Sequence, residues 1–373
     1  MLNRAIQIQD NLEKNKVLII YGPRQVGKTT LVNAFLKKTS LQYKFFTGDD
    51  LVFSNDFSKC DLNLIKKMIG NTELLVIDEA QKINLIGQAL KLVVDHIPGI
   101  YVIATGSSSF DLANETEEPL TGRKNQLNLF PVSILELLHH HTEYEIEQNV
   151  GDYLVYGSYP EVVTYNTFEK KQQRITEIMN AYLIKDIMEF QKIKRAQSIL
   201  DLLRLLAYQT GSEVSTLELS NTLKIDNKTV SRYLQLLEKS FVIFSLQGFS
   251  KNLRKEVTKM KKYYFYDIGI RNALISNFNR IETRNDAGQL WENFLAVERK
   301  KRNAYKMIPM NYYFWRIYNG KEIDWIEERD GNLYGFEFKW REKKVKAPKL
   351  FTETYPNATF EVVTPGNFLH FVS

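Results

Sequence analysis

The sequence contains a single cysteine, Cys60, among its 373 residues. One cysteine excludes an intrachain disulfide and a zinc site built from several thiolates. A chain of this length can bury enough apolar surface to fold without such crosslinks. The cysteine content is therefore typical of a protein from a reducing compartment, and we expect this one to be cytoplasmic.

Long apolar runs are also absent. Runs such as Val17–Tyr21 and Ile100–Ala104 are of strand length, whereas about 20 apolar residues are needed to span a bilayer. Residues 1–13 are polar and lack the apolar core of a signal peptide. We therefore expect neither a membrane segment nor a signal peptide.

The charge of the chain is unevenly distributed. The formal net charge is +6, and the segment from Gln191 to Ile270 alone contains 14 Lys or Arg against 7 Asp or Glu. A basic block of this kind favours contact with the phosphates of a nucleic acid. The alternative is a solvated surface that keeps the protein soluble, and composition alone does not decide between the two.

Short apolar runs alternate with amphipathic stretches up to Phe130. Because these runs are apolar throughout, we expect strands that are covered on both faces, and hence a parallel α/β sheet. The expected strands are Val17–Tyr21, Tyr43–Phe46, Leu74–Ile77, Ile100–Ala104 and Gln126–Phe130, and the expected helices include Lys28–Lys38 and Ile86–His96.

A glycine-rich segment follows the first expected strand. It reads Gly-Pro-Arg-Gln-Val-Gly-Lys-Thr and matches G-x-x-x-x-G-K-[ST] at every fixed position. In this pattern backbone N–H groups and a helix N-terminus bind phosphates, Lys28 reaches the β- and γ-phosphates, and the Thr29 hydroxyl binds Mg²⁺. We predict an ATP and Mg²⁺ site that is formed by Gly22, Pro23, Arg24, Gln25, Val26, Gly27, Lys28, Thr29 and Thr30.

Two further strand ends carry polar residues. Asp78 and Glu79 follow the expected strand Leu74–Ile77, at the edge where open α/β sheets bind ligands. We expect Asp78 to hold Mg²⁺ and Glu79 to orient the attacking water as a catalytic residue. Ser107 follows the next strand along with Thr105, and we predict Ser107 as the polar sensor of the γ-phosphate. The alternative for these last residues is a plain turn, which Ser, Thr and Gly favour.

These motifs together resemble a known family. The quoted segments are Gly22–Leu31, Val76–Gln81, Ala104–Ser108, Leu120–Arg123, Leu129–Glu136, Gly157–Glu161, Tyr182–Asp186 and Tyr266–Gly269. They look like the archaeal and bacterial AAA-type P-loop ATPases with a C-terminal domain of unknown function, and the resemblance covers essentially the whole chain. It implies Arg123 as a residue that senses phosphate charge, the alternative being a surface pair with Glu117 or Glu118. Ser158 departs from the family, in which a second glycine usually follows Gly157.

The basic segment contains a helix–turn–helix pattern. Val214–Leu223 and Asn227–Lys239 have helical periodicity, and Ser215 and Asn227 are the expected caps. Two apolar strands, Phe241–Leu246 and Lys262–Tyr266, would complete a winged helix. Three residues, Lys228, Ser231 and Arg232, would lie on the exposed face of the second helix, where DNA-binding members of this fold contact the major groove. Six more cations in the expected wing favour phosphate contact: Lys251, Arg254, Lys255, Lys259, Lys261 and Lys262.

A second group of carboxylates lies near the C-terminus. Asp324 precedes Glu337 and Lys339, which lie two residues apart on one expected strand and so face the same way. Together with Glu292 on a helix, this pattern resembles a restriction-endonuclease-like core. The resemblance implies a second Mg²⁺ held by Asp324 and Glu337, with Lys339 and Glu292 beside it. The alternative is a surface hairpin with a weak Glu–Lys pair.

The expected domains are a P-loop ATPase core (1–132), a helical lid (133–195), a winged helix (196–275) and a small α/β restriction-endonuclease-like domain (276–373). This organisation predicts an ATP-hydrolysing AAA-type enzyme that acts on DNA, or is regulated by it, through its C-terminal domains. The alternative is an ATP-driven switch that binds another protein, with a silent nuclease-like domain. AAA-type proteins often form rings, so an oligomer is compatible with the resemblance.

Overall fold

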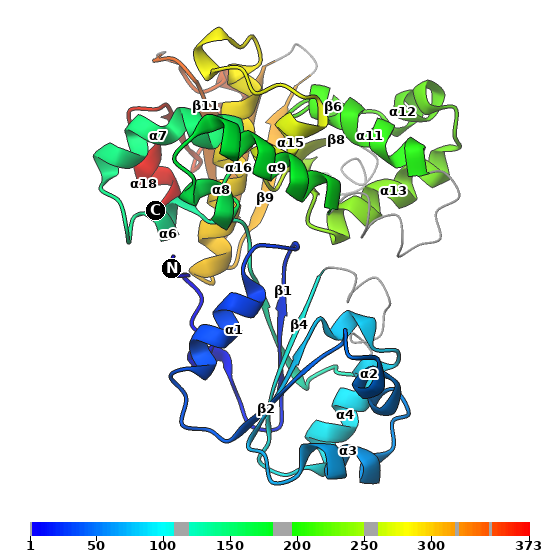
Figure 1. The fold of residues 1–373 in the computed structure, drawn as a ribbon. Helices are drawn as coiled ribbons and strands as arrows, with labels where there is room; N and C mark the ends of the chain where they lie inside the picture. The colour runs from blue at the N-terminus through cyan, green and yellow to red at the C-terminus, as the bar shows by residue number, and fades with distance from the viewer. Residues whose placement is uncertain (1, 108–118, 182–195, 250–259, 318–320, 343–344) are drawn as a thin grey trace. The chain divides into compact units, whose positions relative to one another are not determined.

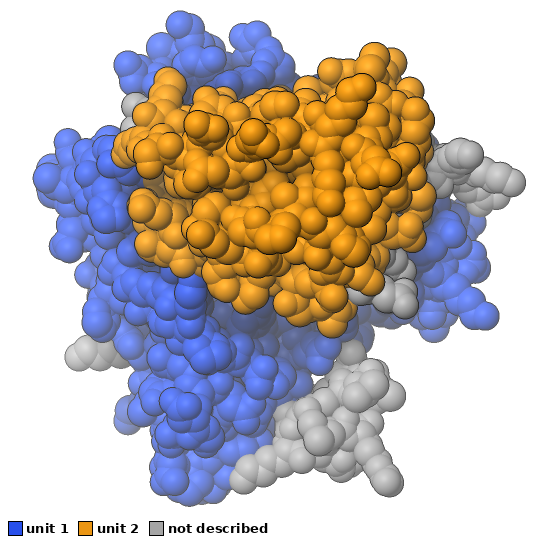
Figure 2. All heavy atoms as spheres, turned by 90° about the horizontal axis from the view of Figure 1, so that it is seen from below, with its two compact units in different colours: residues 1–3, 131–238, 242–373 blue, residues 4–130, 239–241 orange. Residues whose placement is uncertain are grey.

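The computed structural model describes residues 2–107, 119–181, 196–249, 260–317, 321–342 and 345–373. These residues form two compact units, which Figure 2 distinguishes by colour. Unit 2 comprises residues 4–130 and 239–241, and unit 1 comprises residues 1–3, 131–238 and 242–373. Among the described helices, none combines the length and the apolar composition that a membrane crossing requires.

Unit 2 is built on a five-stranded parallel sheet of order β2-β3-β4-β1-β5. Its strands are β1 (Val17–Tyr21), β2 (Tyr43–Thr47), β3 (Leu74–Asp78), β4 (Tyr101–Gly106) and β5 (Lys124–Asn128). Its helices are α1 (Lys28–Leu36), α2 (Leu51–Phe57), α3 (Leu62–Ile69) and α4 (Ile86–His96), with short 3₁₀ turns at Gln9–Asn11 and Ala80–Lys82. The α/β class expected from the sequence is therefore confirmed.

Burial explains why the strands were visible in the sequence. Every residue of β1 and β3 is buried, because α1 covers one face of the sheet and α3 and α4 cover the other (Figure 1). Strand β2 differs from the expectation, since it lies at the edge of the sheet and its first three residues are exposed. Strand β5 begins two residues before the expected start, at Lys124.

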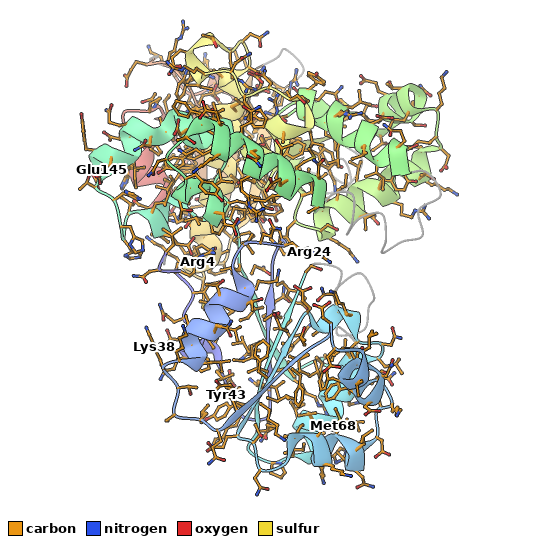
Figure 3. The ribbon with its side chains drawn as sticks, viewed as in Figure 1. Arg4, Arg24, Lys38, Tyr43, Met68 and Glu145 are labelled. Atoms are coloured by element: carbon orange, nitrogen blue, oxygen red, sulfur yellow. The ribbon has the colours of Figure 1, made fainter. Side chains whose placement is uncertain are left out.

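The first part of unit 1 is helical. Its helices are α6 (Ile134–Leu137), α7 (Glu143–Tyr156), α8 (Pro160–Thr164) and α9 (Phe168–Asn180). Local capping fixes the first two, since Ser133 with Glu136 and Thr142 with Glu145 form reciprocal capping boxes (Glu145 is labelled in Figure 3). The quoted motif Tyr182–Asp186 falls outside the described residues.

The rest of unit 1 surrounds one seven-stranded sheet of order β12-β11-β10-β9-β7-β8-β6. Its strands are β6 (Glu213–Val214), β7 (Ile243–Gly248), β8 (Lys261–Phe265), β9 (Asn311–Arg316), β10 (Glu322–Arg329), β11 (Asn332–Phe338) and β12 (Thr359–Val363). Its helices are α11 (Ala196–Tyr208), α12 (Thr216–Leu223), α13 (Asn227–Lys239), α15 (Ile268–Leu274), α16 (Ala287–Tyr305), α17 (Lys349–Thr354) and α18 (Phe368–Val372), with a 3₁₀ turn at Ile281–Thr283.

This sheet joins two segments that the sequence treats as separate domains. Strands β6, β7 and β8 come from the segment 196–275, and β9 to β12 come from 276–373. The junction is a parallel pairing of β7 with β9, in which Gln247 lies opposite Tyr313 and Gly248 opposite Phe314. Helix α16 packs on β8 and β11, one strand from each segment. The two segments thus share one sheet and one covering helix.

Candidate functional site

The glycine-rich loop leaves the carboxyl end of β1 and enters α1. A side-chain Cβ at Gly22 would lie 2.1 Å from the Leu129 carbonyl oxygen, so only glycine fits there. Gly27 has a φ of +97° and is the N-cap of α1, directly before its first residue Lys28. The first backbone N–H groups of a helix have no carbonyl partner within that helix, so they are available to an anion at this point.

Lys28 lies inside this loop and is only 5% exposed. Its Nζ donates to the carbonyl oxygens of Gly22 at 2.8 Å and Pro23 at 2.9 Å. The loop therefore holds the ammonium group beside its own backbone, next to the start of α1. A cation in that position attracts the charged end of a phosphate chain.

Asp78 links the loop to the neighbouring strands. Its Oδ2 accepts a hydrogen bond from Thr29 Oγ1 at 2.8 Å, and its Oδ1 accepts one from Thr105 Oγ1. The parallel register explains the meeting, because Ile77 lies opposite Ala104 and Ile20 lies opposite Thr105. A carboxylate and a hydroxyl are the oxygen ligands that Mg²⁺ takes together with substrate phosphates. These residues therefore fit the metal that the P-loop pattern implies.

Glu79 and Ser107 lie at the same edge of the sheet. Glu79 has a φ of +49°, an unusual backbone conformation for a non-glycine residue. Its backbone N–H donates to Thr105 Oγ1 at 3.3 Å, and its side chain is half-buried. Ser107 is buried directly after β4, beside the loop that follows β1. The structure thus brings together Lys28, Thr29, Asp78, Glu79 and Ser107.

The other predicted loop residues differ in exposure. Val26 is buried, Arg24 is half-buried, and Gln25 and Thr30 are exposed. Sequence reasoning missed Arg4, whose Nη1 and Nη2 donate to the carbonyl oxygens of Val26 and Phe130, both at 2.6 Å. Arg4 and Arg24 lie at the same end of unit 2, and Met68 lies at the opposite end (Figure 3). Arg4 therefore fixes the backbone of the loop from outside.

The prediction that Arg123 contributes to the nucleotide site of its own chain is wrong. The next residue, Lys124, lies opposite Val17 at the start of β1, whereas the loop follows the end of β1 at Tyr21. Four residues of strand separate the two edges, a distance of about 13 Å. Arg123 Nε instead bonds Asp95 Oδ1 at 2.6 Å. The suggested partners Glu117 and Glu118 lie outside the described residues.

Unit 1 contains the second predicted group. Glu292 on α16, Asp324 on β10, and Glu337 and Lys339 at the end of β11 lie around the middle of the seven-stranded sheet. Lys339 Nζ donates to Glu337 Oε1 at 2.6 Å, and the Phe338 N–H donates to Asp324 Oδ2 at 2.8 Å. The alternative of an exposed surface hairpin is excluded, because Asp324 and Glu337 are buried.

A protein cation lies next to the predicted second Mg²⁺ site. Lys262 of β8 inserts its ammonium group beside these carboxylates, 3.1 Å from Glu292 Oε1 and 3.9 Å from Asp324 Oδ1. Within the ranges that the structure describes, no three His, Cys, Asp or Glu side chains converge closely enough to hold a metal ion. The second Mg²⁺ therefore stays a prediction, and a protein cation, Lys262, lies beside one of its two expected ligands, Asp324.

Burial shapes the ionisation of this cluster. It raises the pKa of Asp324 to about 7, helped by the Glu292 carboxylate and opposed by Lys262. Burial and the Asp324 carboxylate raise the pKa of Glu337 to about 7, against the effect of Lys339. The surrounding carboxylates raise the pKa of Lys262 despite its burial, so its amine stays charged at neutral pH.

The helix–turn–helix pattern forms α12 and α13, and one of its two expected caps is corrected. Ser215 caps α12, since its side chain accepts from the Glu218 N–H. The cap of α13 is Asp226 instead of Asn227, because Asp226 Oδ1 accepts from the Thr229 N–H at 2.8 Å. Lys228 and Arg232 are exposed on α13, and Ser231 is half-buried.

Of the six cations expected in the wing, the structure describes only Lys261 and Lys262. Lys262 is buried and its ammonium group pairs with Glu292, so its assignment to phosphate contact is wrong. Lys261 is half-buried. The remaining wing cations Lys251, Arg254, Lys255 and Lys259 lie outside the described residues.

Bacterial proteins resemble this chain over most of its length. Uncharacterized proteins of Mycobacterium tuberculosis and Mycobacterium bovis are each 27% identical over 340 residues, which is 90% of this chain and 73% of theirs. An uncharacterized protein of Haemophilus influenzae is 24% identical, covering 89% of this chain and 84% of its own. These relatives assign no activity.

Solved structures give distant matches. A variant of Thermotoga maritima RuvB is 18% identical with a TM-score of 0.30, covering 61% of this chain and 81% of that one. A signal transduction ATPase with numerous domains from Pyrococcus horikoshii is 16% identical with a TM-score of 0.29, covering 79% and 44%. Family models match an AAA domain over residues 14–138 and domains of unknown function, DUF8612 and DUF4143, over 147–281 and 287–369. The chain therefore carries an AAA-type P-loop domain followed by two domains of unknown function.

Proposed function

We propose that unit 2 binds ATP with Mg²⁺ and hydrolyses it. The observation that carries this proposal is the bond between Thr29 and Asp78, which joins the two halves of a nucleotide–metal site at 2.8 Å. The AAA domain match over residues 14–138 supports it independently. Both halves lie at the carboxyl edge of the parallel sheet, where α/β proteins bind ligands.

In this proposal each residue of the site has its own role in ATP binding or hydrolysis. The backbone of Gly22–Thr29 and the start of α1 bind the phosphates, and Lys28 adds a positive charge within the loop. Thr29 and Asp78 would hold Mg²⁺, which neutralises phosphate charge when bound. Glu79 orients a water molecule, whose oxygen attacks the γ-phosphorus of ATP. The bond from that phosphorus to the β,γ-bridging oxygen breaks, ADP leaves with this oxygen, and the proton of the water passes to the released phosphate. Ser107 hydrogen-bonds to the γ-phosphate as its sensor.

The Mg²⁺ requirement tests this assignment. In Asp78→Asn the side chain keeps its size but loses the charge that attracts the metal. We expect the Mg²⁺ concentration for half-maximal ATP hydrolysis to rise at least about tenfold. Steady-state phosphate release across a Mg²⁺ titration measures it.

Asp95→Asn is the matched control, because Asp95 pairs with Arg123 at the amino edge of the same sheet. It should leave the Mg²⁺ profile unchanged. An identical profile for Asp78→Asn and the wild type would contradict the proposed metal ligand.

We further propose that unit 1 contacts DNA through α13. Lys228 and Arg232 are four residues apart and both exposed, so they lie on one face of the helix. The charge surplus of the segment 191–270 supports a phosphate-binding role. In this proposal DNA contact and ATP turnover regulate each other. The alternative is an ATP-driven switch in which the same surface binds another protein.

Salt dependence separates these two functions. Two phosphate contacts contribute a slope of about −1.8 to the plot of log affinity against log salt. We expect Lys228→Ala/Arg232→Ala to weaken binding to duplex DNA of any sequence and to make the slope shallower by about that amount. Fluorescence anisotropy with labelled duplexes at several salt concentrations gives both quantities.

A control variant, Lys170→Ala/Lys349→Ala, removes the same charge from exposed positions on α9 and α17. It should bind DNA as the wild type does. Equal losses in both double variants would mean general charge attraction, and no DNA affinity in the wild type would favour the protein-binding alternative.

A further inference from the structure

Lys262 is the least expected member of the carboxylate cluster in unit 1. It comes from β8, in the wing segment, whereas the carboxylates come from α16 and β10. The residue is 1% exposed, and its Nζ lies 3.1 Å from Glu292 Oε1, 3.8 Å from Glu322 Oε2 and 3.9 Å from Asp324 Oδ1. One ammonium group thus forms ion pairs with three carboxylates.

The protein also supplies the other partners of these carboxylates. Glu292 Oε1 accepts a second hydrogen bond from Tyr264 OH at 2.7 Å, and Tyr264 lies two residues from Lys262 on the same face of β8. Gly211 closes over the carboxylate of Glu292, since a Cβ at that glycine would lie 3.1 Å from it. The Glu292 side chain is therefore enclosed by groups that already neutralise or hydrogen-bond it.

Most carboxylate oxygens of Asp324 and Glu337 already have a partner within the protein. Asp324 is bonded by the Phe338 N–H and faces Lys262, and Glu337 Oε1 is bonded by Lys339. Glu337 Oε2 is a buried oxygen atom without a hydrogen-bond partner. Mg²⁺ keeps several waters and usually takes only one or two carboxylates from a protein, so what opposes it here is the positive charge of Lys262, whose Nζ lies 3.9 Å from Asp324 Oδ1.

We infer that Lys262 is the built-in counter-ion of this cluster and excludes a divalent cation from it. An ammonium group buried beside carboxylates cannot leave without uncovering their charge, so the exclusion is permanent in the folded chain. The C-terminal domain consequently does not cut nucleic acid by a metal-dependent route. This inference concerns unit 1 alone and does not depend on ATP turnover in unit 2.

The test measures Mn²⁺ binding to the full chain by electron paramagnetic resonance, without nucleotide. We expect Asp324→Asn to change nothing, because the wild type has no metal at this site. We expect Lys262→Met to gain one Mn²⁺ site at least about tenfold tighter than any in the wild type, since a repelling charge is gone. The added site should disappear in Lys262→Met/Asp324→Asn.

Two results would overturn the inference. The first is a wild-type Mn²⁺ site, with a Kd below about 1 mM, that Asp324→Asn removes, and this comparison needs no change at position 262. The second is a folded Lys262→Met protein with no gain in Mn²⁺ binding. Thermal unfolding with and without Mn²⁺ establishes that this variant is folded, and Mn²⁺ should raise its Tm.

Discussion

Lys28→Ala is expected to weaken nucleotide binding severely. The substitution removes the ammonium group that donates to the Gly22 and Pro23 carbonyl oxygens and that lies within the phosphate loop. The loop loses the charge of Lys28 and both of these hydrogen bonds. We expect ATP affinity to fall by at least about 100-fold, or about 2.7 kcal/mol, and hydrolysis to become undetectable. Titration calorimetry with ATP and Mg²⁺ measures the affinity.

Lys38→Ala is the matched control for this experiment. Lys38 is exposed just beyond the carboxyl end of α1 and is labelled in Figure 3. Its removal changes the net charge of unit 2 by the same amount without touching the loop. Wild-type affinity in Lys38→Ala is expected. Undiminished ATP binding by Lys28→Ala would exclude the proposed phosphate site altogether.

Glu79→Gln should separate binding from chemistry. The amide keeps the size and some hydrogen bonding of Glu79 but cannot act as a carboxylate toward the attacking water. Losing a general base or water-orienting residue costs about 10²- to 10⁴-fold in rate. We therefore expect kcat to fall by at least about 100-fold while ATP affinity stays within a factor of about three. Single-turnover hydrolysis and ATP titration supply the two numbers.

Glu73→Gln provides the comparison at the other edge of the sheet. Glu73 immediately precedes β3, and its carboxylate accepts the Gln42 N–H at 2.8 Å. This change should leave kcat unaffected. A Glu79→Gln enzyme with wild-type kcat would remove Glu79 from the mechanism, and a loss of binding alone would make it a binding residue.

The phosphate loop could be predicted because its residues are close in sequence and chemically constrained. Gly22, Lys28 and Thr29 fall at fixed spacings, and the fully buried strands β1 and β3 reveal the sheet on which they are placed. Arg4 could not be found in this way. It acts on the backbone carbonyl groups of Val26 and Phe130, and no side-chain pattern marks a carbonyl group.

Errors arose where sequence order does not determine spatial position. Arg123 comes between two strands that both reach the site, yet β5 begins directly after it and leaves it at the amino edge. Lys262 belongs to a basic run, but alternate residues of a strand face opposite sides. Helix α16 covers one side of β8, so Lys262 is buried while Lys261 is half-buried. The cap of α13 was misplaced by one residue because Asp and Asn cap equally well.

The pairing of β7 with β9 has a consequence for how the C-terminal half is inherited and expressed. The family models end at 281 and begin again at 287, between strands of a single sheet. Cutting the chain there would leave an exposed edge strand on each fragment, and exposed edge strands promote aggregation. Recombination that separated residues 147–281 from 287–369 would expose the same strand edges. We therefore expect the two domains to occur together in homologous proteins.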